Sequence, residues 1–215
     1  MTPYDQFRRL IRDLNLQAQR DLQAIWRSVG GDPAALAEIL AEVVQTYGSA
    51  SASVAADWYD ELRMNEGVRP GFTAVVPEPK APGTTQLVEW ALAKATTEDA
   101  FRSLITGGVQ RRITNYSRDV ITTSSVRDPR ARGWMRTGTG ECGFCAMLVS
   151  RGAVYTKATV DFASHDHCKC SAAPAWSPEQ TQAVKAEFVP SARRRSEDTK
   201  QSDRDRAKAW IAANL

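Results

Sequence analysis

The cysteines and histidines of this chain are confined to one short stretch. All four cysteines and both histidines lie in Cys142-Gly-Phe-Cys145 and in His165-Asp-His167-Cys168-Lys-Cys170. Thiolate and imidazole groups are the ligands that zinc prefers, and pairs of them two residues apart can hold a single ion. The clustering therefore predicts a tetrahedral zinc site that organises the surrounding fold.

Zinc in a structural site takes four ligands, and this stretch offers more than four. The Cys-x-x-Cys and His-x-x-Cys pairs have matched spacing, which favours the set Cys142, Cys145, His165 and Cys168. Cys170 in place of His165 is a close alternative. His167 is the least suitable ligand, because the side chains of His167 and the adjacent Cys168 could reach the same ion only through an awkward turn of the backbone. Four protein ligands leave no position for water, so we expect a structural zinc and not a reaction centre.

The composition is that of a globular protein with a real core. The hydrophobic share is 42% over 215 residues, and the formal net charge is only +3. The basic excess lies in a mixed-charge tail that begins near Arg193, Arg194 and Arg195. A solvated tail is the simplest interpretation, and a tail that binds DNA phosphates is the alternative.

The sequence shows no targeting signal and no membrane span. The N-terminus lacks a basic-then-apolar pattern, and no apolar run approaches the roughly 18 residues that a bilayer requires. We therefore expect a protein made in a cytosol, without a membrane partner. In that reducing compartment the four cysteines are better explained as metal ligands than as disulfides. Disulfides remain the alternative for a protein that works outside the cell.

Residues 1–64 carry three apolar runs at helical spacing. Pro3 and Asp32 mark the starts of the first two helices, and Gly48 marks the end of the second. A third helix is expected from about residue 50 to residue 64. Short glycine-containing turns between the helices require antiparallel packing, so we expect a helical hairpin or bundle.

Residues 65–83 form a proline-rich connector, with residues 72–76 as a candidate edge strand. A second helical segment is expected over 84–128, interrupted near Thr97. Gly107 and Gly108 lie inside its last helix, where each glycine costs about 1 kcal/mol relative to alanine. They predict a kink, a break or a close helix crossing.

The rest of the chain has a different texture. Residues 129–176 are rich in β-prone and turn residues, with 153–155 as a candidate strand, and form the predicted zinc-binding module. Residues 177–215 are expected to be a charged tail with a short terminal helix. The predicted fold class is mainly α: an N-terminal helical bundle, then a small zinc-stabilised α+β module, then an extended C-terminal tail.

Enzyme classes that use such residues fit this sequence less well. A zinc deaminase carries His-x-Glu ahead of its cysteines, an order that is reversed here. A thioredoxin-like site places Cys-x-x-Cys between the strand and the helix of a βαβ unit, whereas the flanks here suggest helix. An HNH-like metal-dependent nuclease is the better alternative, because residues 164–167 resemble its metal motif, but its second Cys-x-x-Cys is missing. We therefore expect that this protein is not an enzyme.

The stretch from Trp134 to Tyr155, which contains Cys142-Gly-Phe-Cys145, resembles the signature of the phage Mu F-like minor head proteins, above all the variant in phages of actinobacteria. The motif of that family is a Cys-x-x-Cys, a glycine turn before a short strand, and a closing His-x-x-Cys-x-Cys. Residues 165–170 supply the closing part. The helical region around Trp58 is similar in character to the one that precedes the motif in those proteins.

The resemblance implies a structural, low-copy virion protein that takes part in head morphogenesis. Such a protein would be assembled in the host cytoplasm, at or near the portal, and in some members touches the packaged double-stranded DNA. The implied partners are the portal and the major capsid protein, with no membrane and no small-molecule substrate. Some relatives carry a protease or toxin domain, for which we expect no room before Leu215. The remaining alternatives are the HNH-like nuclease and a DNA-binding adaptor that works through the basic tail.

Overall fold

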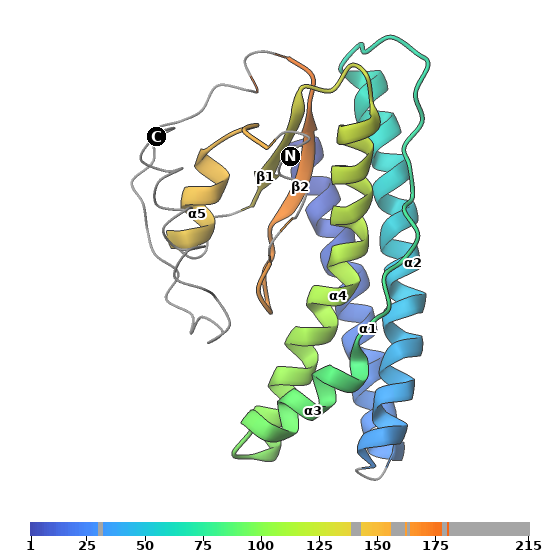
Figure 1. Cartoon of the computed structure of the whole chain (residues 1–215), viewed down its shortest axis with the longest axis vertical. Coiled ribbons are helices and arrows are strands. Elements are labelled where there is room, and N and C mark those ends of the chain that lie inside the picture. The colour runs from blue at the N-terminus through green and yellow to red at the C-terminus, as the bar shows by residue number, and fades with distance from the viewer. Residues whose placement is uncertain (30–31, 139–142, 156–161, 163, 178–179, 181–215) are drawn as a thin grey trace.

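The computed structural model describes residues 1–29, 32–138, 143–155, 162, 164–177 and 180. Most of this part of the chain is helical, as expected, and a two-stranded sheet follows the long helices (Figure 1). The elements, in chain order, are α1 (Pro3–Val29), α2 (Pro33–Asn65), α3 (Thr84–Lys94), α4 (Glu98–Arg127), β1 (Gly133–Thr137), α5 (Gly143–Ser150) and β2 (Ser171–Ala175).

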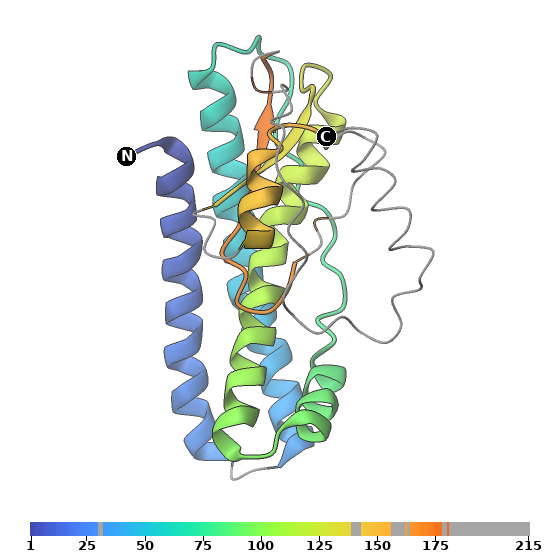
Figure 2. The same ribbon diagram turned by 90° about the vertical axis from the view of Figure 1, so that its left-hand side faces the viewer.

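The long helices α1, α2 and α4 lie side by side along the long axis of the molecule, and α3 packs across one end of α2 and α4 (Figure 1). The sheet packs against the other half of α4. Figure 2 and Figure 1 together place α5 on the face of the sheet that is turned away from α4. Among the described residues, no helix combines the length and the apolar character that a bilayer crossing requires.

The starts of the helices follow local capping chemistry. Thr2 and Asp5 cap α1 reciprocally, since each accepts a hydrogen bond from the backbone N–H of the other at 3.1 Å. The Asp32 side chain accepts from the N–H of residue 34 at 2.9 Å, and the Thr97 side chain accepts from that of residue 100 at 3.1 Å. The predicted starts at Pro3, Asp32 and Thr97 are confirmed.

The predicted end of a helix at Gly48 is wrong, because α2 runs without interruption through this residue. A Cβ atom built on Gly48 would lie 2.8 Å from the ring of Tyr116 on α4. The glycine therefore allows the two helices to approach closely, and the second and third predicted helices are one. Glycine is unfavourable inside a helix, but the packing of Tyr116 against Gly48 offsets this cost. A sequence pattern does not reveal such a contact.

The glycine pair in α4 marks two close approaches inside a continuous helix. A Cβ atom on Gly108 would lie 2.4 Å from Leu87 of α3, and one on Gly107 would lie 2.5 Å from the Nε2 atom of His167. The expectation of a close crossing is confirmed at Gly108, and a break is excluded. Gly107 brings α4 against the cysteine-rich loop.

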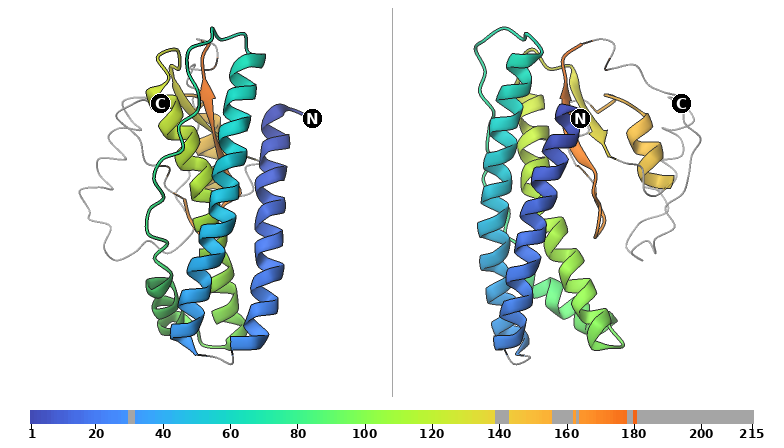
Figure 3. Two further views of the ribbon diagram at one scale, coloured as in Figure 1. Left: turned by 90° about the vertical axis from the view of Figure 1, so that its right-hand side faces the viewer. Right: turned by 180° about the vertical axis from the view of Figure 1, so that it is seen from behind.

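The candidate edge strand at residues 72–76 does not form. The N–H of Ala74 donates to the Asp60 carboxylate at 2.8 Å, and the N–H of Val75 donates to the Ser124 hydroxyl at 2.9 Å. Side chains of α2 and α4 thus satisfy backbone groups that a strand partner would otherwise satisfy. The left panel of Figure 3 shows the connector running along these two helices towards α3.

The sheet is formed by segments far apart in the sequence. Strands β1 and β2 pair antiparallel, with Gly133 opposite Ala175 and Thr137 opposite Ser171. The candidate strand at residues 153–155 is reduced to an isolated bridge between Trp134 and Tyr155. The Ser-Ala-Ala-Pro-Ala sequence of β2 has little strand propensity, and all of its residues are buried.

Two clusters of buried side chains hold the described elements together. The first, here called the helical core, joins α1, α2, α3 and α4 through aliphatic residues such as Leu40 and Ile113. The second, here called the joint core, joins α1, α2 and α4 to the sheet and to the cysteine-rich loop, with Trp134 at its centre. The described part of the predicted zinc module therefore shares its core with the helices. The exact boundaries of the five predicted segments stay a prediction.

Candidate metal centre

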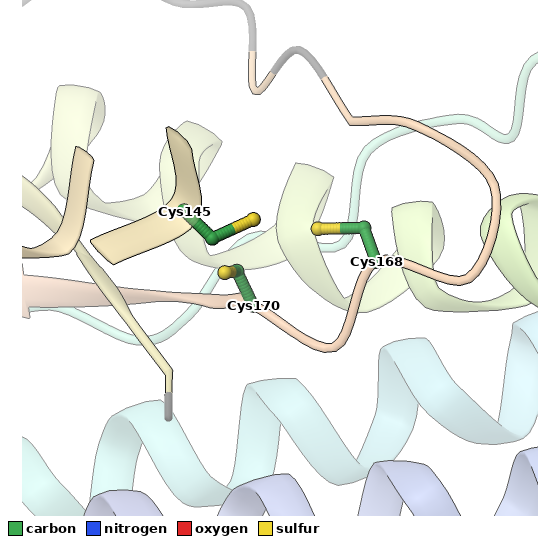
Figure 4. A group of neighbouring side chains, drawn as sticks. All are labelled: Cys145, Cys168 and Cys170. Atoms are coloured by element: carbon green, nitrogen blue, oxygen red, sulfur yellow. The ribbon is translucent and has the colours of Figure 1, made fainter. Parts of the chain in front are cut away.

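Three of the predicted ligands come together in the joint core. Cys145 lies in the first turn of α5. Cys168 lies in the loop that precedes β2, and Cys170 is the last residue of that loop. Their Sγ atoms all lie within 4.8 Å of one another, and the side chains point into a common space (Figure 4). The exposed fractions of the three residues are only 7%, 3% and 4%.

The geometry and the chemistry of this group fit a zinc ion. A tetrahedral centre with zinc–sulfur distances of about 2.3 Å places its sulfurs about 3.8 Å apart. The observed limit of 4.8 Å requires only a small contraction of the group. Cys145, Cys168 and Cys170 form no disulfide within the part of the chain that is described. Three sulfurs facing one another without a disulfide are a ready site for a thiophilic cation.

His165 lies beside the cysteines in an orientation suited to a fourth ligand. Its Nε2 atom is 3.5 Å from the Sγ atom of Cys145, and its Nδ1 atom is 2.8 Å from the carbonyl oxygen of Asp166. If Nδ1 carries the proton and donates to this carbonyl, Nε2 offers its lone pair to a metal. A backbone carbonyl of this kind is a common partner for a metal-binding histidine.

The other histidine points elsewhere. His167 has a left-handed backbone with φ of 60° and an exposed side chain, and its ring packs on Gly107 of α4. The structure thus brings together Cys145, Cys168, Cys170 and the edge of His165. Cys142 lies outside the described residues, so its place as a ligand stays a prediction. Cys170, which the preferred set omitted and the alternative set included, lies close to Cys145 and Cys168.

Hydrogen bonding and burial set the protonation of the two neighbouring thiols. A hydrogen bond from Cys170 holds the pKa of Cys168 well below its usual value, against the effect of burial and with help from the positive charge of Arg118. The pKa of Cys170 is raised because its thiol donates that bond and is buried. The hydrogen bond and the charge of Arg118 therefore favour the thiolate form of Cys168. A bound cation would replace the remaining thiol proton.

Arg118 of α4 belongs to the surroundings of the candidate site, and the sequence pattern did not reveal it. It is only 1% exposed, and its Nη2 atom donates to the carbonyls of Cys168 at 3.0 Å and of Cys170 at 2.7 Å. Burial lowers its pKa to about 10, so it remains a cation at neutral pH. The only signal in the sequence is its place on a helix face shared with Thr114 and Ile121, and this signal is weak.

The flanks of Cys145 differ from the expected helical surroundings. The residue follows β1 and opens α5, which are two of the features of a thioredoxin-like site. The strands β1 and β2 are antiparallel, however, and the described residues contain no parallel βαβ unit. The buried cluster of three sulfurs also differs from the exposed pair that disulfide exchange requires.

Comparison with known proteins places the whole architecture in one family. No curated protein and no solved structure matches the chain. The VG15 protein family matches residues 1–205, a range that covers every described helix and strand and the cysteine-rich loop. This match supports the phage origin that the sequence motif implied, without specifying a minor head protein. The chain belongs to the VG15 protein family, a family of phage proteins.

Proposed function

We propose that this chain is a structural minor head protein of a phage, whose C-terminal module is fixed to the helices by a zinc centre. The observation that carries the structural role is the burial of Cys145, Cys168 and Cys170 in the core that the module shares with α1, α2 and α4. A site buried in this way is suited to hold segments together.

The ligand set supports a scaffold and not a catalyst. Catalytic zinc has three protein ligands and an open position for water or substrate. Here three cysteines already face one another, and His165 or Cys142 can provide the fourth ligand. A bound zinc ion would supply a cross-link between α5, the loop 164–170 and the start of β2. Because no position is left for a substrate, we propose that the protein is not an enzyme.

The place in the virion is supported by the family and by the resemblance to Mu F-like proteins. The VG15 match extends over the helices as well as the module, so both belong to the same phage protein. We propose that the long helices α1 and α2 present the surface that binds the portal or the major capsid protein. A role near the portal also brings the protein close to packaged DNA.

The test is the location of the protein in the assembled phage. Purified virions and procapsids should both contain the chain at low copy number, and the protein should co-purify with the portal. Quantitative mass spectrometry of gradient-purified particles gives the copy number. Absence of the chain from both particles would overturn the proposal.

The nuclease alternative requires its own experiment. The purified, metal-loaded protein is incubated with supercoiled plasmid and Mg²⁺ or Mn²⁺. We expect intact plasmid. Cleavage that disappears in a His167→Ala variant would favour the nuclease, because the side chain of His167 is exposed and belongs to the stretch that resembles the HNH motif.

A further inference from the structure

The buried guanidinium of Arg118 requires an explanation. A charge removed from water is costly unless an opposite charge or a full set of hydrogen bonds compensates for it. Among the described residues, no carboxylate forms an ion pair with Arg118. The groups around it are instead the carbonyl oxygens of Cys168 and Cys170 and the side-chain oxygen of Asn115.

These contacts fix the turn that carries two of the three sulfurs. Nε and Nη2 of Arg118 both donate to the carbonyl of Cys170, at 3.1 and 2.7 Å, and Nη2 also donates to that of Cys168. The rigid fork of the guanidinium therefore holds both residues at once. It ties the turn to α4, and the two thiols point towards Cys145 (Figure 4).

A second buried cation lies close to the first. Arg136 of β1 is 6% exposed, and its Cζ atom lies 3.9 Å from the centre of the Phe162 ring. The Cζ atom of Arg118 lies 4.7 Å from the centre of the same ring. Of the two, Arg118 lies directly beside Cys168 and Cys170, where its charge can offset negative charge on their sulfurs. A divalent ion bound by three or four thiolates has a net negative charge and would complete this balance.

We propose that Arg118 is a positioning residue of the metal centre. Its guanidinium holds the Cys168–Cys170 turn in the metal-binding geometry and offsets the negative charge of the thiolates. This inference rests on the proposed zinc centre and assigns a role to a residue outside the ligand set. It predicts that the metal is held less tightly when Arg118 is replaced, although every ligand remains.

The chain offers a matched control on the same helix. Arg112 of α4 donates to the carbonyls of Pro82 at 2.6 Å and of Gly83 at 2.8 Å, and so holds the connector in the way that Arg118 holds the cysteine turn. Within the described part of the chain, it forms no hydrogen bond with the cysteines. Replacement of Arg112 should weaken the attachment of the connector and leave the metal affinity unchanged.

The experiment compares Arg118→Lys, Arg118→Met and Arg112→Lys in the full chain. Each protein is titrated with Co²⁺, whose visible spectrum reports thiolate ligands and tetrahedral geometry, and the Co²⁺ is then displaced by Zn²⁺ in competition with a chelator. We expect Arg118→Met to lower the Zn²⁺ affinity about 10- to 100-fold, a range typical of residues that support metal ligands, and to alter the Co²⁺ spectrum. Arg118→Lys should lose less Zn²⁺ affinity, because lysine keeps the positive charge but lacks the forked guanidinium that binds two carbonyls at once. Arg112→Lys should match the wild type.

The outcomes separate this role from the zinc centre itself. A wild-type chain that binds neither Co²⁺ nor Zn²⁺ overturns the zinc centre and this role together. If the wild type binds metal and the Arg118 variants bind it with the same affinity and spectrum, the zinc centre stands and the role of Arg118 is overturned. If both Arg118 variants lose their helical circular dichroism while Arg112→Lys keeps it, Arg118 serves the folding of the helices, and the proposal is likewise overturned.

Discussion

The two cores of this protein are built from different chemistry. The helical core contains aliphatic and alanine side chains such as Leu22, Leu40 and Ile105, which need only to be removed from water. The joint core contains cysteines and stacked aromatic rings, with the buried guanidinium of Arg118 beside them. The first core is stabilised by burial alone, whereas the second depends on compensation of its charges and thiols.

This difference should appear most strongly when metal is removed. Chelation should expose the backbone amides of β1, β2 and α5 to hydrogen exchange, because a metal-bound cluster would hold these segments on α4. The amides around Leu40 in the helical core should keep their protection. Exchange measured by mass spectrometry, with and without chelator, checks the contrast.

A uniform loss of protection over both cores would show that the joint core does not depend on metal more than the helical core does. A Cys168→Ser variant without chelator should reproduce the local effect, and a Ser49→Ala variant on the exposed surface of α2 serves as the control.

The next largest effect is expected at a buried ion pair in the joint core. The Nε atom of Arg63 lies 2.9 Å from the Asp128 carboxylate, with 6% and 0% of the two side chains exposed, and Trp176 donates to the same oxygen. Asp128→Asn leaves the guanidinium of Arg63 without its counter-charge and should cost about 3–5 kcal/mol in the free energy of unfolding. Urea denaturation measures this loss.

Asp13→Asn is the control, because the pair of Asp13 with Arg12 is exposed and should contribute less than about 1 kcal/mol. An equal effect of the two variants would contradict the contrast between buried and exposed charges.

The same carboxylate predicts a dependence on pH. Burial acts to raise the pKa of Asp128, but hydrogen bonds from Arg63, from the N–H of Arg130 and from Trp176 outweigh it and lower the pKa below its usual value. The stabilisation is therefore fully present above the pKa of the unfolded chain, and it is lost as the pH falls through the lower pKa of the folded chain. Denaturation at a series of acid pH values should show a smaller pH dependence in Asp128→Asn than in the wild type. Parallel curves would contradict this assignment.

A smaller effect is expected where the two cores meet. Tyr116 packs against both cores, and its ring leaves no room for a Cβ atom on Gly48. Gly48→Ala should therefore destabilise the protein by about 1–3 kcal/mol through overpacking, although alanine favours helix. In a Tyr116→Leu background the same change should cost less, since the ring is gone. A double-mutant cycle by urea denaturation checks the coupling. Additive effects would show that the two residues do not meet.

The sequence predicted what depends on neighbouring residues. The caps at Asp32 and Thr97 act within their own helices, so the starts of α2 and α4 could be located. The end predicted at Gly48 was wrong because its partner, Tyr116, is distant in the sequence. Strand β2 was missed for a similar reason, since it forms through pairing with β1 and burial against α4.

The candidate site shows the same limit. The kinds of ligand could be predicted because cysteine and histidine side chains carry a specific chemistry. The sequence also predicted that they share one site, but it left open which of them come together, since the approach of Cys170 to Cys145 depends on how the chain between them is folded. Arg118 was missed because an arginine on a long helix usually faces solvent, and the loop that covers it comes much later in the sequence.

The proposed role of the module depends most on a single metal ion held by the buried cysteines, and native mass spectrometry with elemental analysis tests this directly. The purified chain should carry one zinc ion, and Cys145→Ser and Cys168→Ser should each lose it while His167→Ala retains it. A wild-type chain without metal, or full zinc content after both cysteines are replaced together, would show that these cysteines do not hold a zinc ion.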